Sequence, residues 1–229
     1  MNKKKAVVLV SGGLDSAVCL AHAVKNFGAT NVLALSMHYG QKHAKEIECS
    51  NKLAEYYGVD HIVHEIKGVF DHSDSTLLQG RDDIEHSSYA SQTSKAHGSP
   101  VATYVPFRNG LFLAHAAAIA ISLGAHVVLY GAHSDDAAGS AYPDCSNAFW
   151  DAMNAAVYEG SGQTCHVEAP LLYMNKADVV RYGTDLGVPF ELTWSCYEGG
   201  EKPCGECGTC IDRAKAFELN GLADPALSK

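Results

Sequence analysis

Near its start the chain reads Val7-Val8-Leu9-Val10-Ser11-Gly12-Gly13-Leu14-Asp15-Ser16, followed by Ala17-Val18-Cys19-Leu20-Ala21. The β-branched apolar run before the two glycines predicts a buried strand, and the apolar residues after them have the spacing of a helix. We therefore expect a strand, a tight turn and a helix. Such a turn can hold phosphate, because glycines let the backbone approach a ligand and a helix start offers free N–H groups and a positive dipole end.

The turn from Ser11 to Ser16 differs from the common nucleotide-binding loops, since it contains neither Gly-Lys-Ser/Thr nor G-x-G-x-x-G. It resembles instead the S-G-G-x-D-S signature of the PP-loop ATP pyrophosphatases, which attach AMP to a substrate oxygen and release pyrophosphate. The two serines add hydroxyl donors. Asp15 would repel phosphate, so it is expected to cap the helix or to reach a metal ion carried by the nucleotide. The alternative is a turn without a ligand.

The composition of the 229-residue chain fits one domain, or one domain with a small appendage. Its apolar content of 47% and charged content of 19% are typical of a globular protein with a core. No apolar run has membrane-spanning length, and residues 6–10 are too short for a signal-peptide core after Lys3, Lys4 and Lys5. We expect a cytoplasmic protein without a membrane partner. The net charge of −9 argues against a general nucleic-acid-binding surface.

Apolar runs that predict strands alternate along the chain with stretches that predict helices. The expected strands are 6–10, 31–37, 61–66, 126–130 and 166–168, and the expected helices are 14–28, 42–57, 111–123, 146–159 and 175–187. This alternation is typical of an α/β fold with a parallel five-stranded sheet and helices on both faces. The helix at 111–123 is apolar nearly all round and is expected to be fully buried.

The stretch from about 67 to 101 is rich in Ser, His, Gly, Asp and Gln and interrupts this alternation. A connection of this length is usually a mobile lid, a binding loop or disorder. Its histidines, His72, His86 and His97, are expected to be solvated. We divide the chain into an ATP-binding domain, residues 1–190, and a small metal-binding segment, residues 191–229.

Several polar residues follow the ends of predicted strands, where ligands bind in open α/β sheets. Tyr39 and Gln41 follow the second strand and are candidate substrate or nucleotide contacts, or parts of a simple turn. Arg108 at a helix start is unfavourable unless an anion is present, which a phosphate, a substrate carboxylate or a surface carboxylate could supply. Lys176, in the first turn of a helix capped by Asn175, is a second candidate cation for phosphates.

Three carboxylates, Asp135, Asp136 and Asp144, lie in the loop after the fourth strand. They suit Mg²⁺ or hydrogen bonding to an amino-bearing heterocycle, and the alternative is that they are ordinary turn residues.

Four of the eight cysteines, Cys196, Cys204, Cys207 and Cys210, form the pattern C-x₇-C-x₂-C-x₂-C. Four thiolates at this spacing match a structural zinc site. An iron–sulfur cluster uses the same ligands, and a redox dithiol would need two of them. The other cysteines, Cys19, Cys49, Cys145 and Cys165, are expected to be ordinary thiols.

The motifs occur in an order that resembles the family of 7-cyano-7-deazaguanine synthases of the queuosine pathway, over nearly the whole chain. They are the Ser11–Ser16 turn, His38-Tyr39-Gly40-Gln41, Val105-Pro106-Phe107-Arg108-Asn109, Tyr142-Pro143-Asp144-Cys145, Pro170-Leu171 with Lys176-Ala177, and the cysteine pattern. The resemblance implies that Ser11, Gly12, Gly13, Asp15 and Ser16 bind ATP. We expect further ATP contacts at their neighbours Val10 and Leu14 and, at the end of the second strand, at Met37 and His38. The resemblance also implies zinc on the four cysteines. From their positions we expect substrate contacts at Tyr39, Gln41, Arg108, Asn109, Asp135, Asp136 and Asp144, with Asp15, Arg108 and Lys176 as catalytic residues.

The resemblance also implies the reaction. Family members use ATP with Mg²⁺ and convert 7-carboxy-7-deazaguanine and ammonia to the nitrile, and a homodimer is expected. The carboxylate would attack the α-phosphorus of ATP, ammonia would turn the acyl adenylate into an amide, and a second adenylation with loss of AMP would leave the nitrile. No covalent enzyme nucleophile is needed, so catalysis would depend on positioning and on cations facing the developing charge.

The chain departs from the family pattern at two places where the base is expected to bind. Phe107 stands where many members have Gly, and residues 133–141 replace a Glu-Thr-Asp-Phe-Ser-Gly stretch. Three other functions are therefore considered. They are a relative that transfers the adenylated deazaguanine carboxylate to another amine, a tRNA-thiolating PP-loop enzyme, and a zinc-stabilised binding module without catalysis.

Overall fold

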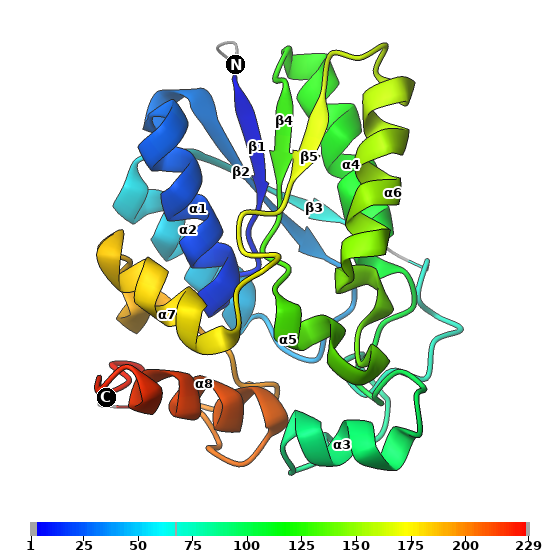
Figure 1. Ribbon diagram of the computed structural model, residues 1–229, viewed down its shortest axis with the longest axis vertical. Helices are drawn as coiled ribbons and strands as arrows, with labels where there is room; N and C mark the ends of the chain where they lie inside the picture. The colour runs from blue at the N-terminus through cyan, green and yellow to red at the C-terminus, as the bar shows by residue number, and fades with distance from the viewer. Residues whose placement is uncertain (1–3, 67, 228–229) are drawn as a thin grey trace.

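The chain folds around one parallel sheet, seen in a computed structural model that describes residues 4–66 and 68–227 (Figure 1). Lys3 and position 67 therefore lie outside the described residues. The strands are β1 (Ala6–Leu9), β2 (Val32–His38), β3 (Asp60–Glu65), β4 (Val127–Leu129) and β5 (His166–Glu168). All of them run parallel, in the order β3-β2-β1-β4-β5. This confirms the predicted five-stranded sheet.

The direction of strand addition reverses between β1 and β4. The chain builds outward from β1 through β2 to β3, and then returns to pair β4 with the other edge of β1. Loops that leave adjacent strands in opposite directions open a crevice at their carboxyl ends, which is the usual ligand site of open α/β sheets. The Ser11–Ser16 turn follows β1 and therefore lies at this crevice.

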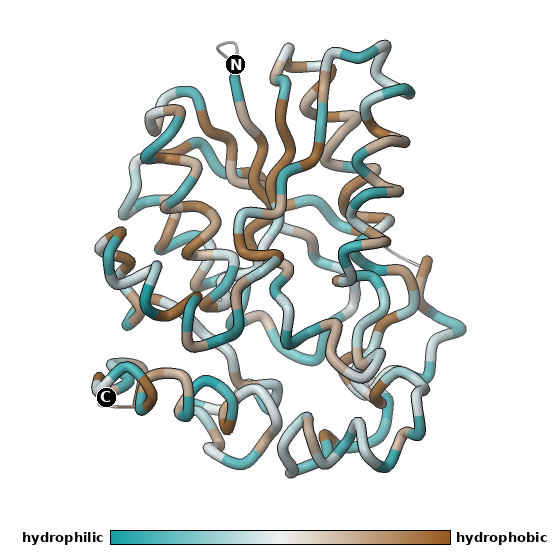
Figure 2. The backbone as a smooth tube through the Cα atoms, viewed as in Figure 1, coloured by the Kyte–Doolittle hydropathy of each residue, from teal (hydrophilic) through white to brown (hydrophobic). Residues whose placement is uncertain are grey.

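Helices cover both faces of the sheet, as expected. They are α1 (Leu14–Phe27), α2 (Lys45–Tyr57), α3 (Tyr89–Ala96), α4 (Arg108–Leu123), α5 (Ser134–Ala137), α6 (Asn147–Gly160), α7 (Lys176–Asp185) and α8 (Gly208–Leu219). Alternate β1 side chains face opposite layers, because Val8 packs in the core with α1 and α7 whereas Val7 packs in the core with α4. Figure 1 shows α1, α2 and α7 on one side of the sheet and α4 and α6 on the other, and Figure 2 shows hydrophobic residues along the central strands.

The helix at 111–123 is not fully buried, so that prediction is wrong. Helix α4 buries one side, including Leu113, Ala116 and Ala120, whereas Ile121 is 43% exposed. It forms an outer layer on the sheet, so its far side meets solvent despite its apolar sequence. Helix α2 also begins at Lys45 instead of 42, because Gln41 forms a β-bridge with Leu78 and the Lys42 N–H donates to the Leu77 carbonyl at 3.0 Å.

The segment between 68 and 101 is more ordered in structure than its composition predicts. It contains α3, whose N-cap Ser88 accepts a hydrogen bond from the Ser91 N–H. Its apolar side chains Phe70, Leu77, Leu78 and Ile84 are buried in the core on the α4 side. His72, His86 and His97 are exposed, as expected, and His86 also pairs with Glu198 at 2.9 Å and with Glu206 at 3.1 Å.

The cysteine-containing segment packs on the main core. The Trp194 N–H donates to the Gly12 carbonyl at 2.9 Å, and Phe217 of α8 stacks edge-on against Phe190 at 5.2 Å. Arg213 is buried and forms an ion pair with Asp224 at 2.7 Å. None of the described helices combines the length and apolar character that crossing a bilayer requires.

Helix α7 begins with the predicted cap. The Asn175 side chain accepts from the Asp178 N–H at 2.9 Å, and the Asp178 carboxylate accepts from the Asn175 N–H at 3.3 Å. We expect Asn175→Ala to lower the free energy of unfolding by about 1 kcal/mol, because the N–H groups of the first turn lose an acceptor. Urea denaturation checks this, and unchanged stability would contradict it.

Candidate active site and metal centre

The turn after β1 is held by its own serines. Ser16 Oγ accepts from the Ser11 N–H at 3.2 Å and donates to the Gly13 carbonyl at 3.0 Å, and Ser11 Oγ accepts from the Gly13 N–H at 3.2 Å. Gly12 has φ +89° and Gly13 is the N-cap of α1, with no capping side chain among the described residues. Asp15 therefore does not cap α1, which corrects one of its two expected roles. The N–H groups of the first turn of α1 stay available to an anion.

One cavity opens at this turn, at the carboxyl ends of β1, β2 and β4. Of the predicted site residues, its lining includes Val10, Ser11, Gly13, Leu14, Asp15, Ser16, Met37, Tyr39, Gln41, Arg108, Asn109 and Asp136. The described lining does not include Gly12, His38, Asp135, Asp144 or Lys176. Twelve predicted positions from four separate stretches of the sequence thus meet at one site.

The predicted residues outside the lining have other contacts. The His38 imidazole lies 3.9 Å from Glu65, at the sheet edge formed by β3. Asp135 accepts from the Lys176 N–H at 2.8 Å, at the start of α7. Asp144 is buried and accepts from the Asn109 N–H at 2.8 Å, so it holds the start of α4. Asp135 and Asp144 thus each accept a hydrogen bond from a backbone N–H in the first turn of a helix.

Asp15 lies in a cluster of charged groups beside the cavity. Lys176 Nζ contacts both Asp15 oxygens at 2.6 and 2.7 Å and lies 3.2 Å from His133 Nε2, which is 3.3 Å from Asp136. Burial raises the pKa of Asp15, but Lys176 and His133 together hold it below its ordinary value. The lysine therefore neutralises Asp15 at the start of α1. His133 Nδ1 is buried and has no hydrogen-bond partner within the described chain.

Asp136 has the opposite pKa shift. Burial raises the pKa of Asp136, although His133 and Lys176 act against it. A carboxyl whose pKa is higher in the folded than in the unfolded chain destabilises the fold once it ionises. We expect Asp136→Asn to leave the free energy of unfolding unchanged below the unfolded pKa of about 4. The variant should become progressively more stable than the unmodified protein as the pH rises from there to the folded pKa, and the difference should stay constant above it.

Urea denaturation over a pH series checks this expectation. Asp151→Asn, at an exposed position of α6, is the control and should leave the pH dependence unchanged. The expectation would be contradicted if the two proteins differed in free energy of unfolding by the same amount at every pH.

Arg108 faces the cavity from the first position of α4. Its guanidinium donates to the Tyr39 hydroxyl at 3.0 Å and lies 5.6 Å from the centre of the Tyr39 ring. The buried Gln41 side chain accepts from the Tyr39 N–H at 2.8 Å and donates to the Met37 carbonyl, so it holds the loop that carries Tyr39. Arg108 is thus fixed without a carboxylate ion pair among the described residues, and can meet an anion in the cavity.

Phe107 does not line the cavity. It has φ +56°, its side chain is 57% exposed, and its ring packs edge-on against Phe149 at 5.9 Å. The departure from Gly at this position therefore lies outside the cavity lining, contrary to the expectation. Of the 133–141 stretch, Asp136 reaches the cavity.

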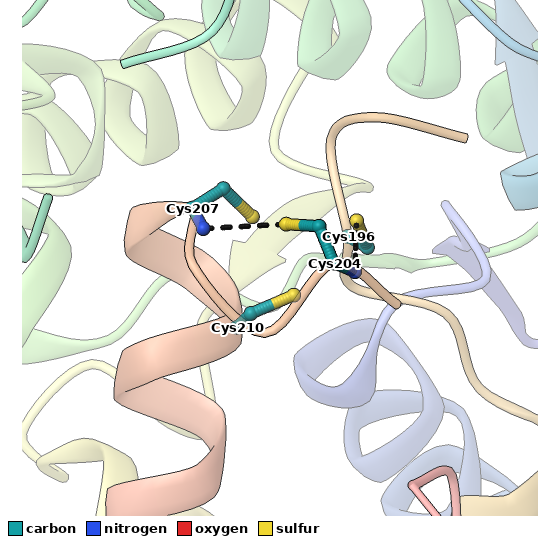
Figure 3. A group of neighbouring side chains, drawn as sticks. All are labelled: Cys196, Cys204, Cys207 and Cys210. Carbon is teal, nitrogen blue, oxygen red and sulfur yellow. Dashed lines mark hydrogen bonds between the residues drawn. The ribbon is translucent and has the colours of Figure 1, made fainter. Parts of the chain in front are cut away.

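The four cysteines form a compact group of sulfurs (Figure 3). Their Sγ atoms all lie within 4.8 Å of one another, and the side chains point toward a common centre. A tetrahedral zinc with Zn–S bonds of about 2.3 Å would place the sulfurs about 3.8 Å apart, so this group fits the ion. Backbone N–H groups of Cys204 and Cys207 donate to Cys196 Sγ and Cys204 Sγ at 3.3 Å, which favours thiolates.

Sequence reasoning missed several lining residues. Glu46 of α2, Tyr130 after β4, and Trp194 and Tyr197 beside Cys196 all line the cavity. Tyr142 stands in the motif 142–145, but no role followed from its position. Hydroxyl contacts join Tyr142 to Tyr89 at 3.0 Å and Tyr89 to Tyr197 at 2.7 Å. No spacing rule signals these residues, because tertiary packing brings them together.

Comparisons with known structures agree with the fold. The chain resembles NMN synthetase from Francisella tularensis, with a TM-score of 0.50, 16% identity, and coverage of 99% of this chain and 82% of that one. It also resembles the U34-tRNA thiolase NcsA from Methanococcus maripaludis, with a TM-score of 0.52, 14% identity, and coverage of 96% and 66%. At these identities the likeness concerns the fold alone.

Sequence comparisons identify the family. The family model of queuosine biosynthesis protein QueC matches residues 5–221. A 7-cyano-7-deazaguanine synthase of Archaeoglobus fulgidus is 44% identical, over 98% of this chain and 90% of its own length. A 7-cyano-7-deazaguanine synthase of Thermoplasma acidophilum is 46% identical, over 98% and 92%. The chain therefore belongs to the QueC family of queuosine biosynthesis, together with these 7-cyano-7-deazaguanine synthases.

Proposed function

We propose that this chain converts 7-carboxy-7-deazaguanine and ammonia to 7-cyano-7-deazaguanine with ATP, releasing AMP and diphosphate. The family membership supports the reaction, and the cavity at the Ser11–Ser16 turn supports its place in the fold. The observation that carries the proposal is an uncapped helix start, behind two glycines, that opens into this cavity. Backbone N–H groups and the dipole of α1 favour a polyphosphate there.

The nucleotide would lie along the turn and the end of β2. In this proposal Val10, Ser11, Gly13, Leu14, Ser16 and Met37 contact ATP, and Gly12 shapes the turn. Mg²⁺ on the phosphates would compete with Lys176 for the Asp15 carboxylate, since both are cations that carboxylate oxygens bind. Lys176, released from Asp15, would then be free to meet a phosphate oxygen.

The base would lie deeper in the cavity, between α4 and the β4 loop. Arg108 would bind the substrate carboxylate, because a guanidinium and a carboxylate form strong charge-assisted hydrogen bonds. Asn109, Tyr39 and Asp136 supply amide, hydroxyl and carboxylate groups in the same lining, and Asp136 suits an amino-bearing heterocycle. Orientation of the carboxylate toward the α-phosphorus would be the main catalytic effect.

The cysteine group would hold zinc in a structural role, since four protein ligands leave no position open for catalysis. We further propose a homodimer that acts in the cytoplasm, where its cysteines would stay reduced. Sedimentation tests the dimer.

One assay tests the reaction. Purified protein is incubated with ATP, Mg²⁺, ammonium and 7-carboxy-7-deazaguanine, and the nucleotides and the mass of the base are followed. We expect AMP and diphosphate together with the nitrile. ADP and phosphate would refute the PP-loop chemistry, and AMP without the nitrile would indicate transfer to another amine.

Replacing Gly13 with valine should abolish turnover while the protein stays folded and keeps its metal. Gly13 has an ordinary φ of −76°, and an added Cβ would meet only Ser11 Oγ at 3.2 Å and the Trp194 carbonyl at 3.6 Å among described atoms. The larger side chain would occupy the space proposed for phosphate. AMP release and metal analysis check this, and retained AMP release would refute the phosphate site.

A further inference from the structure

Glu46 is a carboxylate in the cavity that the proposed roles do not yet use. It lies in the first turn of α2, its side chain is half-buried, and it lines the cavity together with Tyr39, Arg108 and Tyr197. Within the described chain, its carboxylate forms no hydrogen bond and no ion pair. A half-buried carboxylate without such partners does not stabilise the fold, since burying a charge is costly.

Glu46 also lies next to the phosphate turn. The space that a Cβ of Gly12 would fill is occupied by the Glu46 carbonyl oxygen, so the first turn of α2 packs directly on the turn. The Glu46 side chain extends from there into the same cavity as Ser11 and Gly13. A group bound by this carboxylate is therefore close to any acyl adenylate formed at the turn.

The proposed reaction needs a base at this place. Its nitrogen source is mainly ammonium at neutral pH, and ammonium has no lone pair with which to attack a carbonyl carbon. A carboxylate can bind this small cation and accept its proton. The other carboxylate on the phosphate side, Asp15, pairs with Lys176 at 2.6 Å and would bind Mg²⁺ in the proposed ATP complex, so a cation neutralises it in either state.

We propose that Glu46 binds the ammonium ion and acts as the general base that turns it into ammonia. This inference rests on the proposed function and adds the ammonium site to it. One ammonium proton passes to a Glu46 oxygen, and the freed lone pair forms the C–N bond to the acyl carbon. The C–O bond to AMP breaks with its electron pair on the phosphate oxygen, which takes the second proton, and two protons remain on the amide.

The surroundings of Glu46 suit this role. Burial raises the pKa of Glu46 to about 7, against a lowering effect of Arg108. A base titrating near neutral pH is effective, because it is ionised in part and still gains a proton readily. The other titratable groups that interact electrostatically with Glu46 are Tyr39 after β2 and Cys49 in the next turn of α2. Lys42, His43 and Tyr197 line the same cavity, and Lys45 lies over the Trp194 ring.

The test compares Glu46→Gln with Glu48→Gln, an exposed glutamate in the same turn of α2. The first measurement is exchange of labelled diphosphate into ATP with 7-carboxy-7-deazaguanine and no ammonium, which follows adenylation alone. The second is kcat/KM for ammonium at several pH values. The third is amidation with hydroxylamine, which is mostly neutral at pH 7 and needs no base to free its lone pair.

We expect Glu46→Gln to exchange diphosphate normally and to lose about a hundredfold in kcat/KM for ammonium at neutral pH. The loss should shrink as the pH rises and free ammonia becomes abundant, and hydroxylamine should react at nearly the unmodified rate. Glu48→Gln should match the unmodified protein throughout. Equal losses with both nucleophiles, lost exchange in Glu46→Gln, or an unchanged ammonium rate would overturn the inference. Absence of exchange in the unmodified protein would overturn the proposed function itself, and this inference with it.

Discussion

Replacing Gly12 with alanine should lower the free energy of unfolding by on the order of 3 kcal/mol, through backbone strain and collision together. Gly12 has φ +89°, a conformation that residues with a side chain rarely adopt. Its Cβ would also collide with the Glu46 carbonyl oxygen and approach Ser50 N at 2.9 Å and Cys49 Cβ at 3.0 Å. Because these atoms belong to α2, relief of the collision would move the helix away from the phosphate turn.

Gly40 offers a matched control. It has φ +92°, but apart from Gly40 and its two chain neighbours no described atom lies within 4 Å of the position of an added Cβ. Gly40→Ala therefore tests the backbone strain alone, and it should cost about 1 kcal/mol. Urea denaturation of both variants separates the cost of backbone strain from the cost of the collision with α2. If Gly12→Ala were no less stable than Gly40→Ala, close packing of α2 on the turn would be refuted.

Gly12→Ala should also slow catalysis, by more than its loss of folded protein would explain. The turn positions Gly13 and Ser11 for the phosphates in our proposal, and Glu46 lies on the displaced helix. We expect AMP release to fall even at temperatures where Gly12→Ala remains folded. Circular dichroism at the assay temperature establishes that the loss does not come from unfolded protein.

Elements that depend on neighbouring residues in the sequence were predictable. The strand before Ser11 and the helix after Gly13 follow from a local apolar pattern, and the cap of α7 follows from Asn175 and Asp178. The cysteine group also follows from spacing, because two C-x₂-C steps bring three of its sulfurs together. These features needed no knowledge of the tertiary structure.

Features set by packing were not predictable in the same way. The sequence did not show that Lys176 contacts Asp15, which lies 161 residues away along the chain. Nor did it show that the Asp144 carboxylate accepts from the Asn109 N–H at the start of α4. A sequence shows that such groups carry charge, but their partners depend on how β1, β4 and α7 meet.

Burial was also not predictable from local composition, as the apolar sequence of α4 and the polar sequence before α3 show. Ile121 is exposed although it belongs to an apolar stretch, because α4 has a core on one side only. Leu77 and Leu78 are buried in the core although many residues around them are polar. Leu78 forms a β-bridge with Gln41, and the Leu77 carbonyl accepts from the Lys42 N–H, so both are held beside the loop after β2. Composition describes an average, and burial depends on the layer that an element joins.

Removal of the metal from the cysteine group should abolish nitrile formation and leave the sheet folded. Trp194, Ser195 and Tyr197 adjoin Cys196, and Thr209 lies between two ligands, yet all four line the cavity. The Trp194 indole N–H donates to the Cys196 carbonyl at 2.7 Å, so a movement of the loop that carries the four cysteines should change the fluorescence of Trp194. Without the ion, four thiolates held this close would repel one another and the loop would open.

Treatment with a strong zinc chelator should therefore release about one zinc per chain, shift the tryptophan fluorescence, and remove activity while the helical circular dichroism largely remains. Cys204→Ser should reproduce these effects, because Cys204 is a partly exposed ligand whose loss leaves three sulfurs. Cys165→Ser, a buried cysteine outside the group, is the control and should keep its zinc and its activity. Iron and labile sulfide in place of zinc would identify the cluster alternative. If the protein kept full activity after losing all of its metal, the cavity would not depend on the metal-bound conformation of the cysteine segment.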